Sequence, residues 1–559
     1  MIGNNTILDD IEKEIEETLF SYINIESYSN TKNEKNVEQF FLNYFSSIPY
    51  FKNTPKSYGI YPIEEDALNR SVCYAVLRGS GEDTAVLVHH SDIVSIEDFK
   101  LLKDFAFSPE ELKKELIKIK DTLSKDVQKD LDENTFLFGR GVCDMKGGGS
   151  IQMVLMKRYS EISNFKGNIV LISVPDEENL SAGMRSAVKL LDELKAEYRL
   201  KYTLMINSEP HQRKDFSKGI FSEGSVGKIM AFIYVRGVLA HAGKVFEGLN
   251  PLNVLSSIVK KTELNMNFSD IIGNEAAPPP TWLYFRDSKE QYDVSIPLST
   301  KGCLSFLTLN QSPQSILKKI NEICVESFDE VLEDMNANYH KYMSATNQIQ
   351  NGLPWKTNVV NFSELYNEAE NLYGEKFTKK YKNKLEILEL KIKNNEISII
   401  DSNFELVEFI YEYIDDIFPR VVYGLVPPYY PNVSNLYFDN LDLSIKNISK
   451  KLTEFTEKEF NQVYTKECFY TGISDLSYSS IINTEGVLES LESSMPLFGG
   501  IYNIPIDKIS RISMPCINIG PWGKDFHKLT ERVFVEDLYE RTPKIINKAI
   551  SIALEHDNL

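Results

Sequence analysis

Histidine and carboxylate side chains stand where apolar segments of the chain end. His90 and Asp92 close an apolar run and, being two residues apart, project to the same side of an extended strand. The pair alone is open to a structural interpretation, in which neighbouring groups satisfy both side chains. Taken alone, this structural interpretation is the favoured one, and the alternative is a metal site, since a nearby carboxylate can orient an imidazole or a catalytic carboxylate. His89 points the opposite way, and we interpret it as structural.

A glycine-rich segment, 139–149, carries one carboxylate, Asp144, and leads into a predicted helix. One interpretation is a backbone cradle for phosphate, although the spacing matches neither of the common nucleotide-binding patterns. The other is a carboxylate held in a permissive backbone. Such a carboxylate can bridge two divalent cations through its two oxygens.

Further candidate ligands follow two more apolar strands and one late polar segment. Glu177 and Glu178 are adjacent at the end of a strand, Glu209 directly follows another, and His527 lies near the end of the chain. Adjacent acids repel each other unless cations neutralise them. Two histidines with several carboxylates suit zinc, cobalt or manganese, so the residues predict a metal site.

These residues need elements that bring them together. Apolar strands alternate with helices in the N-terminal part, with strands at 72–77, 85–89, 168–174 and 203–206 and helices at 150–159 and 184–198. This alternation predicts the α/β class, with a sheet buried on both faces. Ligands in such sheets gather at the carboxyl ends of the strands, where the candidate residues stand.

The pattern changes in the middle of the chain and then returns. A two-layer α+β arrangement is predicted from strands at 228–236, 303–309 and 421–426 and helices at 251–262 and 313–335. It is interrupted at 341–419 by a polar insertion of helical period, whose charged part, 379–395, we interpret as a solvated helix face. The α/β pattern resumes with helices at 444–460 and 543–556 and strands at 467–470 and 515–519. We predict a catalytic domain formed by 1–218 and 435–559, with a lid domain, 219–434, inserted.

Composition restricts the partners. The chain has 559 residues, 42% of them hydrophobic, and a net charge of −20, which disfavours nucleic acid and anionic membrane as partners. The N-terminus lacks the features of a signal peptide, and no apolar run is long enough for a membrane span. Six scattered cysteines indicate neither a disulfide framework nor a zinc finger. We expect a cytoplasmic protein with a small-molecule or short-peptide substrate.

As a set, the motifs resemble the co-catalytic di-zinc metallopeptidase family, which includes acetylornithine deacetylase, succinyl-diaminopimelate desuccinylase, aminoacylase and glutamate carboxypeptidase. The resemblance rests on His-x-Asp, Gly-Arg-Gly-x-x-Asp-Met-Lys-Gly-Gly, Asp-Glu-Glu, Glu-Pro, Ala-His-Ala-Gly and a late His, in that order. The segments 278–281, 427–431 and 520–525 resemble in particular the RocB-like branch, which is linked to arginine utilisation. The resemblance implies a zinc-peptidase α/β domain that carries an inserted α+β lid.

The resemblance also implies site roles. It implies two divalent metal ions, expected to be Zn²⁺ with Co²⁺ or Mn²⁺ as alternatives, and five ligands: His90, Asp144, Glu178, Glu209 and His527. Asp144 would bridge the ions, His90 and Glu209 would complete one site, and Glu178 and His527 the other. Glu177 would be the general base, and Asp92 would support the site from outside.

The resemblance implies fewer of the residues that would recognise the substrate. The lid residue His241 matches a histidine that stabilises the oxyanion in the other subunit of a homodimer, and the loop residues Thr471, Gly472 and Ser474 resemble a substrate loop. The Asn and Arg that bind the substrate carboxylate in many relatives have no counterpart around Pro297. Lys301 is a candidate substitute, but an ammonium lacks the bidentate geometry of a guanidinium.

We therefore expect a hydrolase, either a deacylase, an aminopeptidase or a carboxypeptidase. Its substrate would be a small acylated amino acid or short peptide, with a link to arginine or ornithine catabolism. One alternative is a catalytically inert, metal-binding regulatory protein that retains the fold. Another is a structural scaffold that binds no metal.

Overall fold

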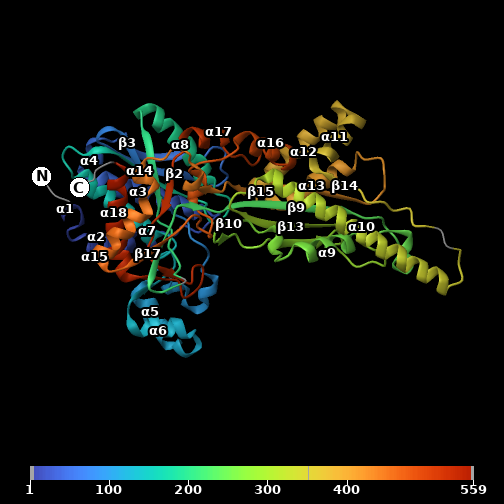
Figure 1. Ribbon diagram of the computed structural model, residues 1–559, viewed down its shortest axis with the longest axis horizontal. Helices are drawn as coiled ribbons and strands as arrows, with labels where there is room; N and C mark the ends of the chain where they lie inside the picture. The colour runs from blue at the N-terminus through green and yellow to red at the C-terminus, as the bar shows by residue number, and fades with distance from the viewer. Residues whose placement is uncertain (1–4, 214, 350–351, 555–559) are drawn as a thin grey trace. The chain divides into compact units, whose positions relative to one another are not determined.

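The computed structural model describes residues 5–213, 215–349 and 352–554. These form two compact units (Figure 1). Unit 1 draws on Met1–Val226, Val433–Ile482 and Pro505–Leu559, and unit 2 on Gly227–Asn432 and Asn483–Ile504.

An eight-stranded sheet forms the centre of unit 1. Its strands, in spatial order, are β1 (Tyr58–Pro62), β2 (Ser71–Arg78), β5 (Lys166–Val174), β3 (Ser80–His90), β6 (Lys201–Asn207), β18 (Cys516–Asn518), β7 (Lys218–Ser222) and β17 (Val463–Glu467). The neighbours β5, β3 and β6 run parallel to one another. Each carries a nearly continuous buried run, as expected for strands covered on both faces.

Helices cover both faces of this sheet. One core unites Leu87 and Leu171 with side chains of α2 (Ile11–Ile23), α3 (Asn36–Ser47), α7 (Lys146–Ser160), α15 (Ile448–Phe460) and α18 (Thr542–Ala553). The helix α8 (Ala182–Tyr198) contacts β1, β2 and β5 with side chains outside that core, which places it on the opposite face. The predicted α/β class is confirmed.

A smaller core lies between the β3 and β4 segments of unit 1. The helices α5 (Pro109–Lys118) and α6 (Lys125–Glu133) and the short strand β4 (Phe136–Phe138) enclose Phe99, Leu112, Leu131 and Phe138. β4 pairs with β20 (Arg532–Phe534), which pairs in turn with β19 (Gly523–Lys524). This three-stranded sheet holds both ends of the loop that carries His527.

Two expectations for the C-terminal part were inaccurate. The strand predicted at 467–470 is wrong: β17 ends at Glu467, and Tyr470 makes only an isolated bridge with Ser225. β17 is an edge strand with mostly exposed side chains, so the pattern of apolar residues could not predict it. The helix predicted at 444–460 is divided into α14 (Leu443–Lys446) and α15 at Asn447.

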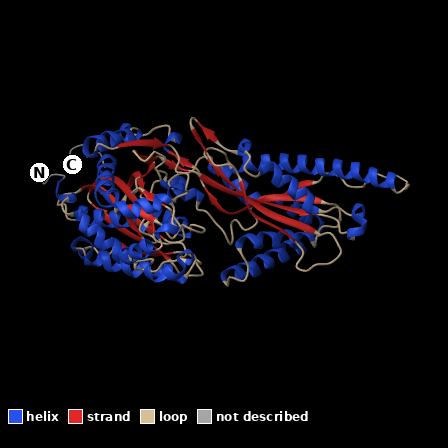
Figure 2. Cartoon of the chain, turned by 90° about the horizontal axis from the view of Figure 1, so that it is seen from below, coloured by secondary structure: helices blue, strands red, loops and turns tan. Residues whose placement is uncertain are grey.

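Unit 2 contains a five-stranded sheet between helices (Figure 2). The strand order is β12 (Thr281–Asp287), β13 (Ser299–Thr308), β9 (Gly227–Arg236), β15 (Arg420–Tyr430) and β14 (Val359–Asn361). The helices α9 (Pro251–Thr262) and α10 (Pro313–Ala345) contact this sheet. The edge strand β12 was not predicted, because half-exposed residues on both of its faces hide the two-residue period.

The polar insertion forms helices with their own core. α11 (Phe362–Tyr373), α12 (Glu375–Lys393) and α13 (Ile399–Tyr411) pack against side chains of the sheet such as Phe232. Within α12, Tyr381 and Leu388 are buried, so only part of the segment 379–395 is a solvated face.

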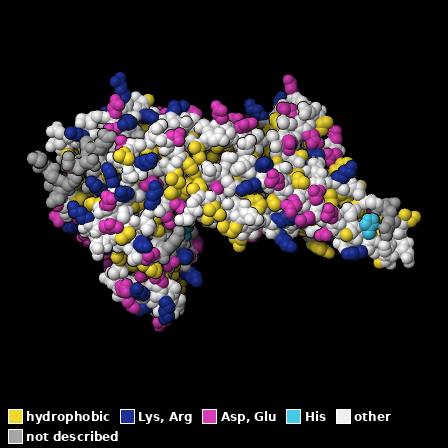
Figure 3. All heavy atoms as spheres, viewed as in Figure 1, with side chains coloured by type: hydrophobic (Ala, Val, Ile, Leu, Met, Phe, Trp, Pro, Cys, Tyr) yellow, Lys and Arg dark blue, Asp and Glu magenta, His cyan; other side chains and the backbone are white. Residues whose placement is uncertain are grey.

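Charge is mixed over the molecular surface in view. Figure 3 shows acidic and basic side chains interspersed on this face. Within the described residues, every helix is too short or too polar to span a lipid bilayer.

Candidate metal centre

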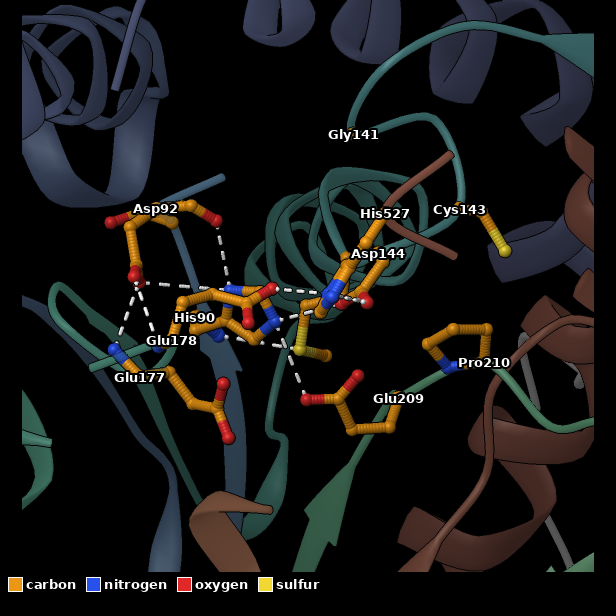
Figure 4. A network of polar contacts seen from close by, with 12 residues as sticks. His90, Asp92, Gly141, Cys143, Asp144, Glu177, Glu178, Glu209, Pro210 and His527 are labelled. Atoms are coloured by element: carbon orange, nitrogen blue, oxygen red, sulfur yellow. Dashed lines mark hydrogen bonds and ion pairs between the residues drawn. The ribbon is translucent and has the colours of Figure 1, made fainter. Parts of the chain in front are cut away.

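Three adjacent parallel strands bring the predicted ligands to one edge of the unit 1 sheet. His90 is the last residue of β3, Glu177 and Glu178 follow β5, and Glu209 follows β6 (Figure 4). Because β5, β3 and β6 are parallel neighbours, their carboxyl ends meet at the same edge. The four side chains thus converge from separate parts of the chain.

Asp144 reaches this edge from the loop that precedes α7. A Cβ atom on Gly148 would lie 2.2 Å from the carbonyl oxygen of Ser208, and one on Gly147 would lie 2.3 Å from that of Val142. A side chain at position 148 would therefore push the start of α7 away from the segment that carries Glu209, and one at position 147 would push it away from the preceding loop. Of the two interpretations of the glycine-rich segment, the structure favours close packing around a fixed carboxylate.

The two oxygens of Asp144 face two different histidines. Asp144 Oδ1 lies 3.0 Å from His90 Nε2, and Oδ2 lies 3.2 Å from His527 Nε2. His90 Nε2 is also 3.4 Å from Glu209 Oε1, while His527 Nε2 is 2.8 Å from Glu178 Oε1. The five side chains form two groups that share Asp144, each with one imidazole and one further carboxylate.

The hydrogen bonding of His90 leaves a place for a cation. Its Nδ1–H donates to the backbone carbonyl of Asp92, 3.0 Å away, so the lone pair of the neutral ring is on Nε2. Nε2 faces oxygens of Asp144 and Glu209, which are themselves acceptors. A proton or a metal ion must lie between them for the contact to be favourable. The donor set of imidazole nitrogen and carboxylate oxygen therefore fits a divalent metal.

The pKa shifts of the clustered side chains also indicate a site that can bind cations. Burial works to raise the pKa of the Asp144 carboxyl, but hydrogen bonds from His527 and His90 outweigh it and lower the pKa. Hydrogen bonds to Asp144 and Glu178 raise the pKa of His527 to about 10. Burial, followed by the negative charge of neighbouring carboxylates, raises the pKa of both Glu177 and Glu209. The cluster has excess negative charge, which bound cations would offset.

Asp92 holds in place the acidic loop, residues 176–178, which follows β5. Its two carboxylate oxygens accept the backbone N–H groups of Glu177 (3.1 Å) and Glu178 (3.2 Å). The half-buried Glu177 side chain has an oxygen within 4.8 Å of the candidate ligand atoms of His90 and Glu209. With the backbone of both residues fixed by Asp92, the Glu178 side chain faces His527 and the Glu177 side chain stays half-buried beside His90 and Glu209.

The acidic loop has a second anchor, which sequence reasoning did not identify. Asp176, at φ 70°, accepts a 2.7 Å hydrogen bond from Arg70 Nη1 and a 3.0 Å bond from the backbone N–H of Ala182. The carboxylate of Asp176, the first acid of the Asp-Glu-Glu segment, thus helps to hold the loop through these two hydrogen bonds. Its neighbours are left to project toward the site.

Glu531 was also missed. It is buried and lies four residues after His527, and its Oε2 accepts a 2.6 Å hydrogen bond from Arg140 Nη1. Three backbone N–H groups donate to its Oε1, those of Gly141 (2.9 Å), Cys143 (3.3 Å) and Asp144 (3.3 Å). One carboxylate therefore joins the loop of Asp144 to the loop of His527. The spacing of an acid four residues after the late histidine was the available signal.

The loop 471–475 has both exposed and buried parts. Thr471 and Gly472 are exposed, whereas Ser474 is buried and its Oγ has no hydrogen-bond partner in the described structure. The next residue, Asp475, was not singled out from the sequence, yet it is fully buried. Burial, together with the charges of Asp92 and Glu178, raises its pKa to about 7 against the opposing effect of His90.

Two predicted residues belong to unit 2. His241 is exposed, and its Nδ1 accepts a 3.0 Å hydrogen bond from the backbone N–H of Gly243. It lines a pocket of about 520 Å³ together with Lys289 and Tyr292. Lys301 Nζ lies 3.6 Å from Glu408 Oε1, so its charge already has a partner within unit 2.

Comparison with known proteins identifies relatives over the whole length. The chain is 29% identical over 543 residues to the uncharacterized protein YqjN of Bacillus subtilis, covering 96% of each chain. It is 26% identical over 541 residues to Protein RocB of the same organism, covering 96% of this chain and 94% of RocB. It is 24% identical over 271 residues to the succinyl-diaminopimelate desuccinylase of Buchnera aphidicola, covering 48% of this chain and 64% of that protein.

Solved structures share the fold. The aminopeptidase PepT of Bacillus cereus matches with a TM-score of 0.50 at 12% identity, covering 98% of this chain and 99% of the other. The di-peptidase Dug1p of Saccharomyces cerevisiae matches with a TM-score of 0.50 at 13% identity, covering 99% and 98%. The family resemblance seen in the sequence is confirmed, as is the predicted fold.

The family model named "Peptidase family M20/M25/M40" matches residues 121–543, which is more than half of the chain. The matched region includes Asp144, Glu177, Glu209 and His527 and both segments that flank unit 2. The protein is thus a hydrolase of the peptidase type, and the chain belongs to peptidase family M20/M25/M40.

Proposed function

We propose that this protein hydrolyses an amide or peptide bond in a small acylated amino acid or a short peptide, using two divalent cations. His90, Asp144, Glu178, Glu209 and His527 would hold the cations. The observation that carries the proposal is the position of Asp144, whose two oxygens face two imidazoles 3.0 and 3.2 Å away. We expect zinc, with cobalt or manganese as alternatives, because the donors are imidazole nitrogen and carboxylate oxygen.

An amide resists hydrolysis because its carbonyl is a poor electrophile and its amine is a poor leaving group. Two bound cations supply Lewis-acid polarisation of the carbonyl and lower the pKa of water. Glu177 is the side chain suited to take a proton from the attacking water and deliver it to the leaving nitrogen. Burial, followed by the neighbouring acids, raises the pKa of Glu177 above the usual range of a glutamate, the direction that favours a group able to hold the proton it has accepted.

His241 is the proposed donor to the oxyanion. Since Gly243 N–H donates to Nδ1, the neutral ring carries its proton on Nε2, which can donate to a developing negative charge. We propose that this histidine acts in the site of a partner subunit, which makes the enzyme a homodimer. The loop residues Thr471, Gly472 and Ser474 are proposed to lie near the substrate.

We further propose that the protein acts in the cytoplasm and in arginine or ornithine catabolism. The second part rests on the likeness to Protein RocB and on the resemblance of the sequence to the arginine-utilisation branch. The alternative, an inert metal-binding regulatory protein, shares every metal ligand with this proposal. It differs at Glu177, because a protein that only binds metal has no need of a half-buried acid beside the ligands.

Replacement of Glu177 separates the two functions. Glu177→Gln keeps the size of the side chain but cannot accept the proton, so we expect turnover to fall about 10²- to 10⁴-fold. The metal content, measured by mass spectrometry of the purified protein, should stay at two ions per chain. Turnover would be measured over a panel of N-acyl amino acids and dipeptides.

The surface variant Glu454→Gln, which changes the charge by the same amount in an exposed pair with Lys450, is the matched control. Wild-type turnover in Glu177→Gln would exclude Glu177 as the base. A wild-type protein that binds two ions but hydrolyses no member of the panel would favour the regulatory alternative.

A further inference from the structure

Asp475 is a buried carboxylate at the candidate metal centre with no role in the mechanism above. It begins the short helix η7 (Asp475–Tyr478), which contacts β3 and β6, the strands that lead to His90 and Glu209. Its exposed fraction is 0%. Since His90 ends β3 and Glu209 follows β6, Asp475 belongs to an element packed against the strands that carry these two side chains.

Neither oxygen of Asp475 has a hydrogen-bond partner in the described part of the chain. The other buried acids near the site differ in this respect. Asp92 accepts two backbone N–H groups, Asp176 accepts Arg70, and Glu531 accepts Arg140. An unsatisfied buried carboxylate is costly, so a chain that retains one needs a group that arrives later to satisfy it.

Charge indicates the nature of that group. Six carboxylates meet at the site: Asp92, Asp144, Glu177, Glu178, Glu209 and Asp475. Two divalent cations bring four positive charges, so six ionised carboxylates keep a net charge of two negative. Ligand positions are already filled by five side chains, and Asp92 is bonded to the backbone. The group that reaches Asp475 is therefore best a cationic hydrogen-bond donor from the substrate.

We propose that Asp475 binds the free ammonium group on the residue whose carbonyl is cleaved. The helix η7, which Asp475 begins, contacts β3 and β6, the strands that lead to His90 and Glu209. The cation that Asp475 binds would therefore lie beside the scissile carbonyl. An α-ammonium is two bonds from that carbon, whereas a side-chain guanidinium is several bonds farther away.

This inference rests on the proposed function and narrows it. The substrates are short peptides with an unblocked amino terminus, and N-acyl amino acids are poor substrates. Asp475 is a specificity-determining residue that attracts the ammonium. It takes no part in the proton transfer assigned to Glu177.

A pair of hydroxamates tests the inference by binding rather than by turnover. L-leucine hydroxamate and N-acetyl-L-leucine hydroxamate share a metal-binding group and differ in the free amine. Their dissociation constants would be measured by calorimetry on the metal-loaded full-length protein. We expect the free amine to bind about 10- to 100-fold more tightly, as for a hydrogen bond between charged groups.

In Asp475→Asn, which keeps the shape and removes the charge, this preference should fall below about twofold, with metal content unchanged. Glu454→Gln, the exposed control, should keep the full preference. Equal binding of the two hydroxamates to the wild type would overturn the inference. So would a loss of metal in Asp475→Asn, which would mark the residue as a ligand, or equal weakening of both probes. A wild-type protein that binds neither metal nor hydroxamate would instead refute the proposed function, and the inference with it.

Discussion

Single carboxylates in this site differ in role because their hydrogen bonds differ. Asp176, Glu177 and Glu178 are consecutive, yet Arg70 anchors the first, the second is left half-buried, and the third faces His527. The backbone of the last two is fixed by Asp92. The order of acids in the sequence therefore becomes an order of functions through the loop that holds them.

Glu531 illustrates how a residue can act on the site without touching a metal or substrate. Its carboxylate fixes the loop of Asp144 by accepting three backbone N–H groups. We expect Glu531→Ala to weaken metal binding by about 10- to 100-fold, as outer partners of ligands do. Leaving Arg140 buried without this partner should also cost about 3–5 kcal/mol of stability.

Titration of the metal-free protein with zinc, together with denaturant unfolding, measures both effects. Glu531→Gln, which retains an acceptor oxygen, should recover part of the metal affinity. The exposed Glu536→Gln, which breaks the pair with Arg541, serves as the control. Our interpretation of Glu531 as a positioning residue fails if Glu531→Ala loses stability but binds zinc as tightly as the wild type.

The sequence was most informative where chemistry and pattern coincide. His90 ends a buried strand and Glu178 and Glu209 come soon after two others, so the apolar strand pattern and the residue types together pointed to one edge of a sheet. Asp475 had no such mark, since it follows an irregular loop, and its burial becomes visible only when η7 packs against β3 and β6. The partners of Glu531 are some 390 residues away in the chain, which no local pattern can reveal.

At the scale of elements, the central parallel strands were predictable and the edge strands were not. β3, β5 and β6 are buried on both faces and read as continuous apolar runs. β12 and β17 lie at sheet edges with exposed residues, so their hydrophobic pattern is weak. The predicted ligands stand at the ends of the central strands, which explains why they could be placed at one edge of the sheet while the edge strands were misplaced.

The segment before β2 is joined to the acidic loop by one cation and several acids. Arg70 pairs with Glu34 (2.8 Å), Asp66 (2.8 Å) and Asp176 (2.7 Å). Burial, followed by the charge of Asp92, raises the pKa of Glu34 from 4.5 to about 8. Because the folded state holds this proton more tightly, the associated stability is present below pH 4.5 and is lost as the pH rises through about 8.

Glu34→Gln imitates the protonated acid and should remove this part of the pH dependence. We expect the variant and the wild type to have similar free energies of unfolding near pH 4.5, and the variant to be the more stable above about pH 8. Denaturant unfolding from pH 5 to 9 would measure the difference, with Glu454→Gln as the surface control. Parallel pH profiles for Glu34→Gln and the wild type would contradict the expectation.

At the scale of the whole molecule, the candidate oxyanion donor and the candidate metal ligands belong to different units. His241 is an exposed residue of unit 2. Its pocket is lined by Lys289 and Tyr292 rather than by metal ligands. Unit 1 carries the complete ligand set but, among the residues described there, no histidine is left to donate to an oxyanion: His89 contacts Gln152, His211 contacts Arg213, and the other two face carboxylates. We therefore predict that the donor is His241, and our proposal that it comes from a second copy of the chain can be tested directly.

Mixing two inactive variants tests this arrangement. His241→Ala should lower turnover with little change in metal content, because His241 belongs to neither metal group. In a heterodimer of His241→Ala and Glu177→Gln, one of the two sites combines an intact Glu177 with an intact His241 from the partner. Co-expression with two affinity tags and purification of the heterodimer should therefore restore about half of the wild-type activity per dimer, if sites act independently. Each variant homodimer, purified in the same way, provides the baseline. A fully active monomer in solution, or heterodimers that form without recovering activity, would show that each chain completes its own site.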